Sequence, residues 1–242
     1  MIQIFKKEFN SFLNSLIAYV VIATFLSSIG LMMWVFPETS VLDYGYSEMD
    51  TLFTVGPYML IFLVPAITMR SFAEEKKMGT LEFLLTKPLH DMDVILGKFF
   101  AGFVLVMVSI IPTIVYYYSI FLLGEPQGNV DAAGVIGSYI GLVLLGGIFC
   151  TLGILASSLS PNQIVSFIIG ALLCLLFYSG FDTLSTLVTS GTLALNIKQL
   201  GILYHYDSIS KGLIDSRDLI YFISVSGLMI LLTKTHLSSR QW

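Results

Sequence analysis

Charged side chains are scarce in this chain. Of its 242 residues, Asp, Glu, Lys and Arg together make up only 12%, about half the share found in an ordinary soluble domain. Hydrophobic residues make up 56% and fall in long blocks rather than in short alternating segments. This composition excludes a soluble globular protein and a membrane β-barrel. It predicts an all-α integral membrane protein.

Cysteine and histidine are also rare. The two cysteines, Cys150 and Cys174, lie inside apolar runs, where a lone thiol behaves as a small hydrophobic side chain. The three histidines are scattered along the chain. These residues indicate neither a disulfide framework nor a metal site, and we expect the chain itself to bind no cofactor.

Motifs for nucleotide hydrolysis and for metalloprotease chemistry are missing from the sequence. No GxxxxGK[ST] phosphate-binding loop and no HExxH motif occur, so the chain is not expected to hydrolyse ATP by itself. The apolar runs contain almost no ionisable residues, and Arg70 and Asp182 lie at their ends. Ion-coupled carriers keep such groups near the middle of the membrane, so this class is disfavoured. We expect no nucleic-acid partner.

Six apolar runs are long enough to cross a bilayer as helices. They cover roughly residues 16–36, 52–69, 98–123, 134–157, 163–181 and a short last run at 219–233. The fourth run contains Gly137-xxx-Gly141, a spacing that permits close helix packing but is common in membrane helices. The sequence therefore predicts six transmembrane helices within one domain over residues 1–242.

Residues 1–15 have the pattern of an amphipathic helix. The apolar positions, at spacings of three and four, are Ile2, Phe5, Phe9, Phe12, Leu13 and Leu16. Such a helix lies along a membrane surface with its lysines at the lipid headgroups. A cleaved signal peptide is the alternative, but the apolar run that follows is long enough to span the bilayer. We predict an interfacial helix that leads into the first span.

Positive charge falls mainly on one side of the six-span topology. The lysines and arginines on that side are Lys6, Lys7, Arg70, Lys76, Lys77, Lys87, Lys98, Lys234 and Arg240. The remaining three are Lys198 and Lys211, in the long outer loop at residues 182–216, and Arg217, directly after it. The positive-inside rule therefore predicts that both termini and residues 70–90 are cytoplasmic.

The charged passage between the second and third runs has the sequence RSFAEEKKMGTLEFLLTKP, from Arg70 to Pro88. Gly79-Thr80 can start a short helix there and Pro88 can end it. The leucines that share one face of that helix are Leu81, Leu84 and Leu85. We predict a water-facing loop with a short helix that presents this apolar ridge to a soluble partner. A solvated loop whose charges serve only solubility is the other interpretation.

The residues of this passage resemble a family signature. Residues 74–88 are similar to the E-x-x-x-G-T-L-E-x-L-L-x-x-P signature of ABC-2 type permeases, and residues 205–218, HYDSISKGLIDSRD, resemble the passage before the last helix of that family. With the interfacial helix and the six spans, the resemblance covers essentially the whole chain. It is greatest to permease subunits of the gliding-motility ABC transporter of Bacteroidetes, followed by those of nitrous-oxide-reductase maturation.

The resemblance implies a half-transporter in the bacterial inner membrane. Two permease chains, identical or different, would pair, and each would contact a separate ATPase subunit that holds ATP and Mg²⁺. An auxiliary gliding-motility membrane protein would be a further partner. The ATPase-coupling residues would be Glu74, Glu75, Gly79, Thr80, Leu81, Glu82, Leu84, Leu85 and Pro88. The outer gate segment would include His205, Tyr206, Lys211, Gly212, Asp215 and Arg217.

The resemblance leaves two possible sets of contacts open for the coupling side chains. The leucines would pack either on the ATPase or on the permease's own inner shell. The glutamates would either face basic groups on the ATPase or fix the loop to neighbouring helix ends. The segment at residues 193–211 would be helical, lie at the outer membrane surface and close the exit path.

An intramembrane enzyme is the alternative function. It would use Glu74-Glu75 as a catalytic pair, as prenyl-protein proteases use paired glutamates. Against it, no histidine lies within a span, and both acids lie in a lysine-rich aqueous passage where their pKa values need not shift. We therefore expect an exporter permease without an enzymatic site of its own.

Overall fold

The computed structural model describes residues 1–81, 90–189 and 191–239, and these residues contain helices and no strand. Six helical segments are long and apolar enough to cross a membrane: Leu16–Trp34, Asp50–Lys77, Asp91–Leu123, Ala132–Leu159, Gln163–Thr186 and Ser216–Ser238. The predicted all-α membrane fold with six spans is confirmed. The last span, at 23 residues, is not the short helix expected, because its polar ends are helical as well.

Three of the six spans are single helices and three are built from consecutive elements. The single helices are α2 (Leu16–Trp34), α9 (Ala132–Leu159) and α14 (Ser216–Ser238). The composite spans are α4 (Asp50–Thr68) with α5 (Arg70–Lys77); α7 (Asp91–Ile110) with η1 (Ile111–Thr113) and α8 (Ile114–Leu123); and α10 (Gln163–Leu175) with the π-helical turn η2 (Leu176–Gly180) and α11 (Phe181–Thr186). The shorter helices are α1 (Ile2–Leu13), α3 (Val41–Tyr44), α12 (Gly191–Gln199) and α13 (Ile202–Ser210).

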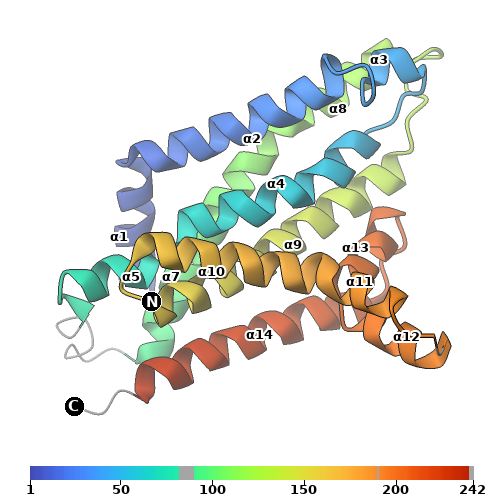
Figure 1. The fold of residues 1–242 in the computed structure, drawn as a ribbon. Coiled ribbons are helices and arrows are strands. Elements are labelled where there is room, and N and C mark those ends of the chain that lie inside the picture. The colour runs from blue at the N-terminus through green and yellow to red at the C-terminus, as the bar shows by residue number, and fades with distance from the viewer. Residues whose placement is uncertain (82–89, 190, 240–242) are drawn as a thin grey trace.

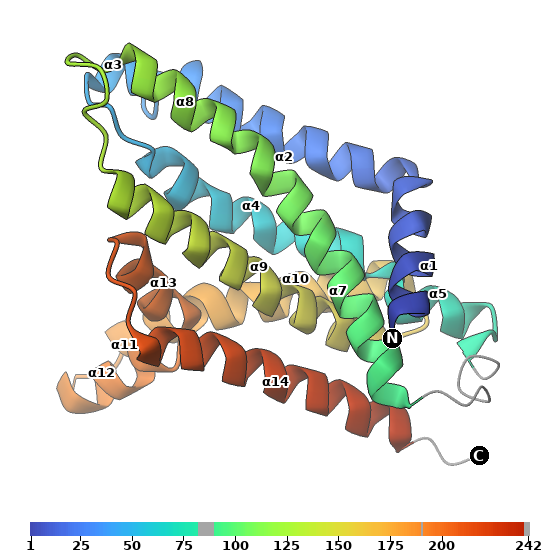
Figure 2. The ribbon, with the colours of Figure 1, turned by 180° about the vertical axis from the view of Figure 1, so that it is seen from behind.

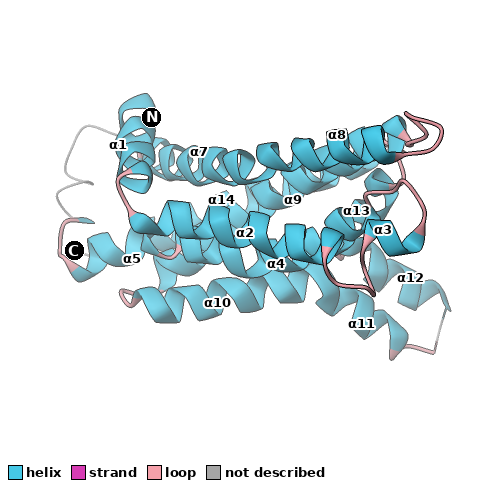
Figure 3. Cartoon of the chain, turned by 90° about the horizontal axis from the view of Figure 1, so that it is seen from above, coloured by secondary structure: helices cyan, strands magenta, loops and turns pink. Residues whose placement is uncertain are grey.

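The six spans lie side by side, and the shorter helices gather at the two ends of the bundle (Figures 1 and 2). Helices α1 and α5, with the last turn of α14, lie at one end, which we call the inner end. Helices α3, α12 and α13 lie at the opposite, outer end (Figure 3). Helix α9 occupies the centre, in contact with α4, α7, α10, α13 and α14.

The charged passage that begins at Arg70 is not a loop throughout. Its first eight residues form α5, which follows α4 after the single residue Met69. Alanine, glutamate and lysine are good helix formers, so the end of the apolar run does not end the helix. Helix α5 ends where Gly79 adopts φ of +66°, a left-handed conformation that favours glycine.

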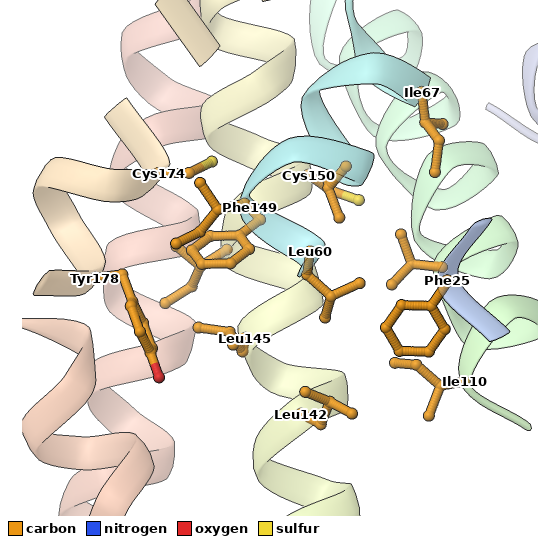
Figure 4. Close-up of a cluster of buried hydrophobic side chains, with 14 of the residues drawn as sticks. Phe25, Leu60, Ile67, Ile110, Leu142, Leu145, Phe149, Cys150, Cys174 and Tyr178 are labelled. Atoms are coloured by element: carbon orange, nitrogen blue, oxygen red, sulfur yellow. The ribbon is translucent and has the colours of Figure 1, made fainter. Parts of the chain in front are cut away.

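The main core fills the space between α2, α4, α7, α9 and α10 (Figure 4). Phe25, Leu60, Leu145 and Phe149 are among its buried side chains, and both cysteines are free and buried in it. A second, smaller cluster lies at the inner end and joins the two ends of the chain. Its members are Ile4, Phe72, Leu81, Val94, Ile95, Ile154 and Leu237; we call it the inner apolar cluster.

Helix α1 lies where the amphipathic helix was predicted, and its position at a membrane surface stays a prediction. Ile4 and Phe12 are buried in the protein, whereas Ile2 and Leu13 are exposed. Ile4 faces Gly97 of α7, where a Cβ atom would lie 2.9 Å from the Cβ of Ile4. The missing side chain lets α1 approach α7 closely, and that contact selects the face with Ile4.

Candidate functional site

The inner end contains a buried ion-pair network centred on Lys98 of α7. The Lys98 side chain is 1% exposed, and its Nζ lies 2.9 Å from Glu8 Oε1 and 3.0 Å from Glu75 Oε1. The same ammonium donates a 2.6 Å hydrogen bond to the Ser71 carbonyl. One buried cation therefore connects α1, α5 and α7.

Lys7 completes this network from the exposed side. Its Nζ lies 3.3 Å from Glu75 Oε1 and 3.5 Å from Glu8 Oε1. Burial lowers the pKa of Lys7, but the carboxylates of Glu8 and Glu75 outweigh it, so the pKa is raised above its ordinary value. Two lysines and two glutamates thus balance their charges, as buried ionic groups require. We call these four residues the inner ion-pair network.

The paired glutamates of the charged passage have separate partners. Glu75 is 8% exposed and faces Lys98 and Lys7 of its own chain. Glu74 forms an ion pair of 3.1 Å with Arg70 one helical turn earlier. Because each carboxylate has its own cation, the arrangement does not favour a catalytic pair of glutamates.

A serine on α9 holds the junction of α4 and α5. The Ser157 hydroxyl accepts hydrogen bonds from the backbone N–H groups of Phe72 and Ala73, at 2.9 and 3.1 Å. The same hydroxyl donates a 3.0 Å hydrogen bond to the Met69 carbonyl. These N–H groups belong to the first turn of α5, which has no partners within its own helix. Helix α5 is thereby fixed to the central helix of the bundle.

Replacing Ser157 by alanine should lower the free energy of unfolding by about 1–3 kcal/mol, because two buried N–H groups lose their acceptor. Ser158→Ala is the matched control, since among the described residues the Ser158 hydroxyl bonds only to the Leu155 carbonyl within α9. Thermal unfolding of the purified protein in detergent measures both. Equal losses for the two variants would show that the junction does not depend on Ser157.

The other predicted coupling residues fall at or beyond the end of α5. Thr80 donates a backbone hydrogen bond of 3.0 Å to the Glu75 carbonyl. Leu81 is 3% exposed and packs in the inner apolar cluster, so it contacts its own chain. Glu82, Leu84, Leu85 and Pro88 lie outside the described residues.

The outer end contains α12 and α13, which cover most of the outer segment predicted to be helical at residues 193–211. Helix α13 packs against α9 at Gly137, where a Cβ atom would lie 2.6 Å from the Ile209 carbonyl oxygen. The Tyr206 hydroxyl donates a 2.8 Å hydrogen bond to the Phe53 carbonyl of α4. The Gly137-xxx-Gly141 motif therefore packs against the outer helix α13. The spacing of the two glycines did not indicate which helix would pack there.

The remaining gate residues have different positions. His205 lies 2.7 Å from Asp218 of α14 and stacks on Tyr221. Gly212 adopts φ of +78° where α13 ends. Asp215 caps α14 by accepting a hydrogen bond from the backbone N–H of Arg217. The predicted residues His205, Tyr206, Lys211, Gly212, Asp215 and Arg217 therefore lie on one turn and the two helices beside it.

Sequence reasoning assigned no role to Glu8, Lys98, Ser157, Asp218 or Tyr221. The signal for Lys98 was its place at the start of an apolar run, where a charge is costly unless it is paired. Asp218 belongs to the passage before the last helix that resembles the family. Nothing in the sequence distinguishes Ser157 from the other small polar residues near it.

One comparison identifies the family. Residues 2–235 match the model of a protein family that is described as "ABC-2 family transporter protein". The chain belongs to the ABC-2 transporter family. No curated protein matches the chain.

As an ABC-2 family member, the chain is a membrane component of a transporter, and the family expected from the charged passage is confirmed. The match contains the first five spans, most of the sixth, the inner ion-pair network and the gate residues. The narrower resemblance to gliding-motility permeases stays a prediction.

Proposed function

We propose that the chain is the permease subunit of an ABC exporter whose ATP is hydrolysed by a separate ATPase subunit. The observation that carries this proposal is the attachment of α5 to the transmembrane bundle. Helix α5 continues from α4, bonds to α9 through Ser157 and pairs with α1 and α7 through Lys98. A partner that displaces the passage after α5 would thus act on several spans.

Coupling would work through a movement of α5, which would transmit a displacement of residues 79–88 to the transmembrane helices. The partner ATPase, with ATP and Mg²⁺, would dock on residues 79–88 and displace them during its cycle. Helix α5 and the spans fixed to it would follow, because packed interfaces move between discrete arrangements rather than deforming gradually. The outer helix α13, bonded to α4 through Tyr206, would receive that movement at the other end.

The proposed orientation places the inner end in the cytoplasm. Helices α1 and α5, which lie at that end, carry Lys6, Lys7, Arg70, Lys76 and Lys77. An excess of lysine and arginine in short segments beside spans is typical of the cytoplasmic side. We propose a bacterial inner-membrane location with cytoplasmic termini, and pairing with a second permease chain. The resemblance to gliding-motility permeases supports an auxiliary membrane protein of that system as a further partner.

The coupling proposal is tested by two sets of leucine substitutions. Leu84→Ala with Leu85→Ala should abolish copurification of the ATPase while leaving the unfolding temperature unchanged, because a desolvated interface anchor contributes about 2 kcal/mol or more. Leu81→Ala is the matched comparison. It should lower the free energy of unfolding by about 2–5 kcal/mol, because Leu81 packs on its own chain.

Glu82→Ala should weaken ATPase binding less than the double leucine variant, since exposed ion pairs contribute under about 1 kcal/mol. Its effect should decrease as salt rises, whereas that of the leucines should not. Retention of the ATPase by the double leucine variant, with unchanged ATP hydrolysis, would refute docking on residues 79–88.

A further inference from the structure

The side chain of His205 has hydrogen-bond acceptors on both ring nitrogens. Nδ1 lies 2.7 Å from Asp218 Oδ1, and Nε2 lies 2.9 Å from the Gln199 carbonyl oxygen. The ring stacks on Tyr221, with the ring centroids 3.8 Å apart. Three helices meet there, since Gln199 ends α12, His205 lies in α13, and Asp218 and Tyr221 belong to α14.

These contacts require one proton more than a neutral histidine beside an ionised aspartate provides. A carbonyl oxygen only accepts, so Nε2 must carry a hydrogen. The contact between Nδ1 and Oδ1 needs a second hydrogen, held either by the imidazolium or by the carboxylic acid. Removal of that proton leaves two acceptors facing each other at one contact.

The neutral imidazole would keep the contact with Asp218. A hydrogen bond to a carboxylate is roughly twice as strong as one to a neutral carbonyl, so the single remaining hydrogen goes to Nδ1. The bond to Gln199 is then lost. Among the described residues, the end of α12 then keeps the 2.7 Å hydrogen bond from the Tyr221 hydroxyl of α14 to the Leu200 carbonyl.

Other titratable groups surround this pair on every element packed against α13. They are Asp182 on α11, Lys198 on α12, Tyr204, Tyr206 and Asp207 on α13, Lys211 after it, Asp215, Arg217 and Tyr221 at the start of α14, Tyr178 in η2, Asp131 before α9 and Tyr139 on α9. Lys198 pairs with Asp182 at 3.1 Å. Burial raises the pKa of Asp207, which Lys211 and Lys198 oppose. None of these groups normally titrates in the range where histidine does.

We propose that His205 and Asp218 form a proton-dependent link that holds the end of α12 on the outer end of the bundle. In the protonated form the link is complete, and the end of α12 is fixed to α13. As the pH rises, the bond to Gln199 breaks and α12 is released at that end. The outer segment of this permease would thereby respond to the pH of the medium it faces, without involvement of the ATPase.

The test uses spin labels on the full-length chain in lipid nanodiscs. Cysteines replace Leu195 of α12 and Leu228 of α14, both exposed, whereas Cys150 and Cys174 are fully buried and stay unlabelled. Distances are measured between about pH 5 and about pH 9, on either side of the ordinary histidine value of about 6.5. We expect the ratio of released to held α12 to rise about tenfold with pH, the change that follows loss of one charge-assisted hydrogen bond.

Two variants assign the effect to the pair. Asp218→Asn can donate to Nδ1 while a neutral His205 donates to Gln199, so this variant should stay held at every pH. His205→Gln cannot make both contacts and should be released at every pH. Lys198→Gln, which breaks the pair with Asp182, should keep the pH response. A wild-type distance that does not change with pH, or an Asp218→Asn variant that responds like the wild type, would overturn the proposal.

Discussion

Replacing Lys98 by methionine is expected to lower the free energy of unfolding by about 3–5 kcal/mol. The substitution keeps much of the side-chain volume but removes the ammonium that lies between Glu8 and Glu75. Two carboxylates are then left close together in a site where Glu75 is almost fully buried. Breaking a buried ion pair by removing one partner has this order of cost because the other charge stays desolvated.

Lys7→Met is the control for this variant. The Lys7 side chain contacts the same two carboxylates but is 61% exposed, so its loss should lower the free energy of unfolding by under about 1 kcal/mol. Adding Glu8→Gln and Glu75→Gln to Lys98→Met should recover much of the lost stability. Thermal unfolding in detergent measures all of them. If Lys98→Met and Lys7→Met have equal effects, the buried position of Lys98 has no energetic consequence.

The second large effect is expected at Gly137, the point of contact between α9 and the outer helix α13. An alanine there would place its Cβ 2.6 Å from the Ile209 carbonyl oxygen and 2.9 Å from the Gly212 Cα. Both are backbone atoms, so no side-chain rotation relieves the overlap and α13 must move. Overpacking of this kind lowers stability by about 1–3 kcal/mol.

The displacement of α13 has its own measurement. Ile209 is fully buried, so a cysteine at that position should react slowly with a water-soluble thiol reagent, and Gly137→Ala should accelerate the reaction. Gly227→Ala is the matched control, since a Cβ atom added at Gly227 would meet nothing within 4 Å. In a helix interior, replacing glycine by alanine raises the free energy of unfolding by up to about 1 kcal/mol. Unchanged labelling in Gly137→Ala would mean that α13 tolerates the added atom.

The sequence predicted the large features of this fold because those depend on long apolar runs. Six spans and the helix at the N-terminus follow from hydropathy and periodicity, whereas the helices before the last span were expected only from the family resemblance. The close approach of α1 to α7 could not be predicted from the sequence. It depends on a single glycine, Gly97, opposite Ile4, and a glycine in a membrane helix does not identify its neighbour.

The candidate sites were predicted less completely than the fold. The family signature pointed to Glu75 and His205. The partners of His205 lie close to it in the sequence, whereas Lys7, a partner of Glu75, is 68 positions away. Lys98 meets Glu8 across 90 positions, and Ser157 meets Phe72 across 85. Such pairings are set by how the spans pack, and neither charge nor periodicity along one segment contains that information.

The inner apolar cluster has a consequence for the order in which the protein is built during synthesis. Ile4 is synthesised long before Leu237, yet both are buried in this one cluster. Helix α1 is amphipathic and can wait at the bilayer surface while the spans insert one after another. The cluster in which Ile4 of α1 packs is complete only after α14 has inserted. The inner end that we propose for coupling would therefore mature only after α14 has inserted, and a chain stopped before α14 would lack this cluster.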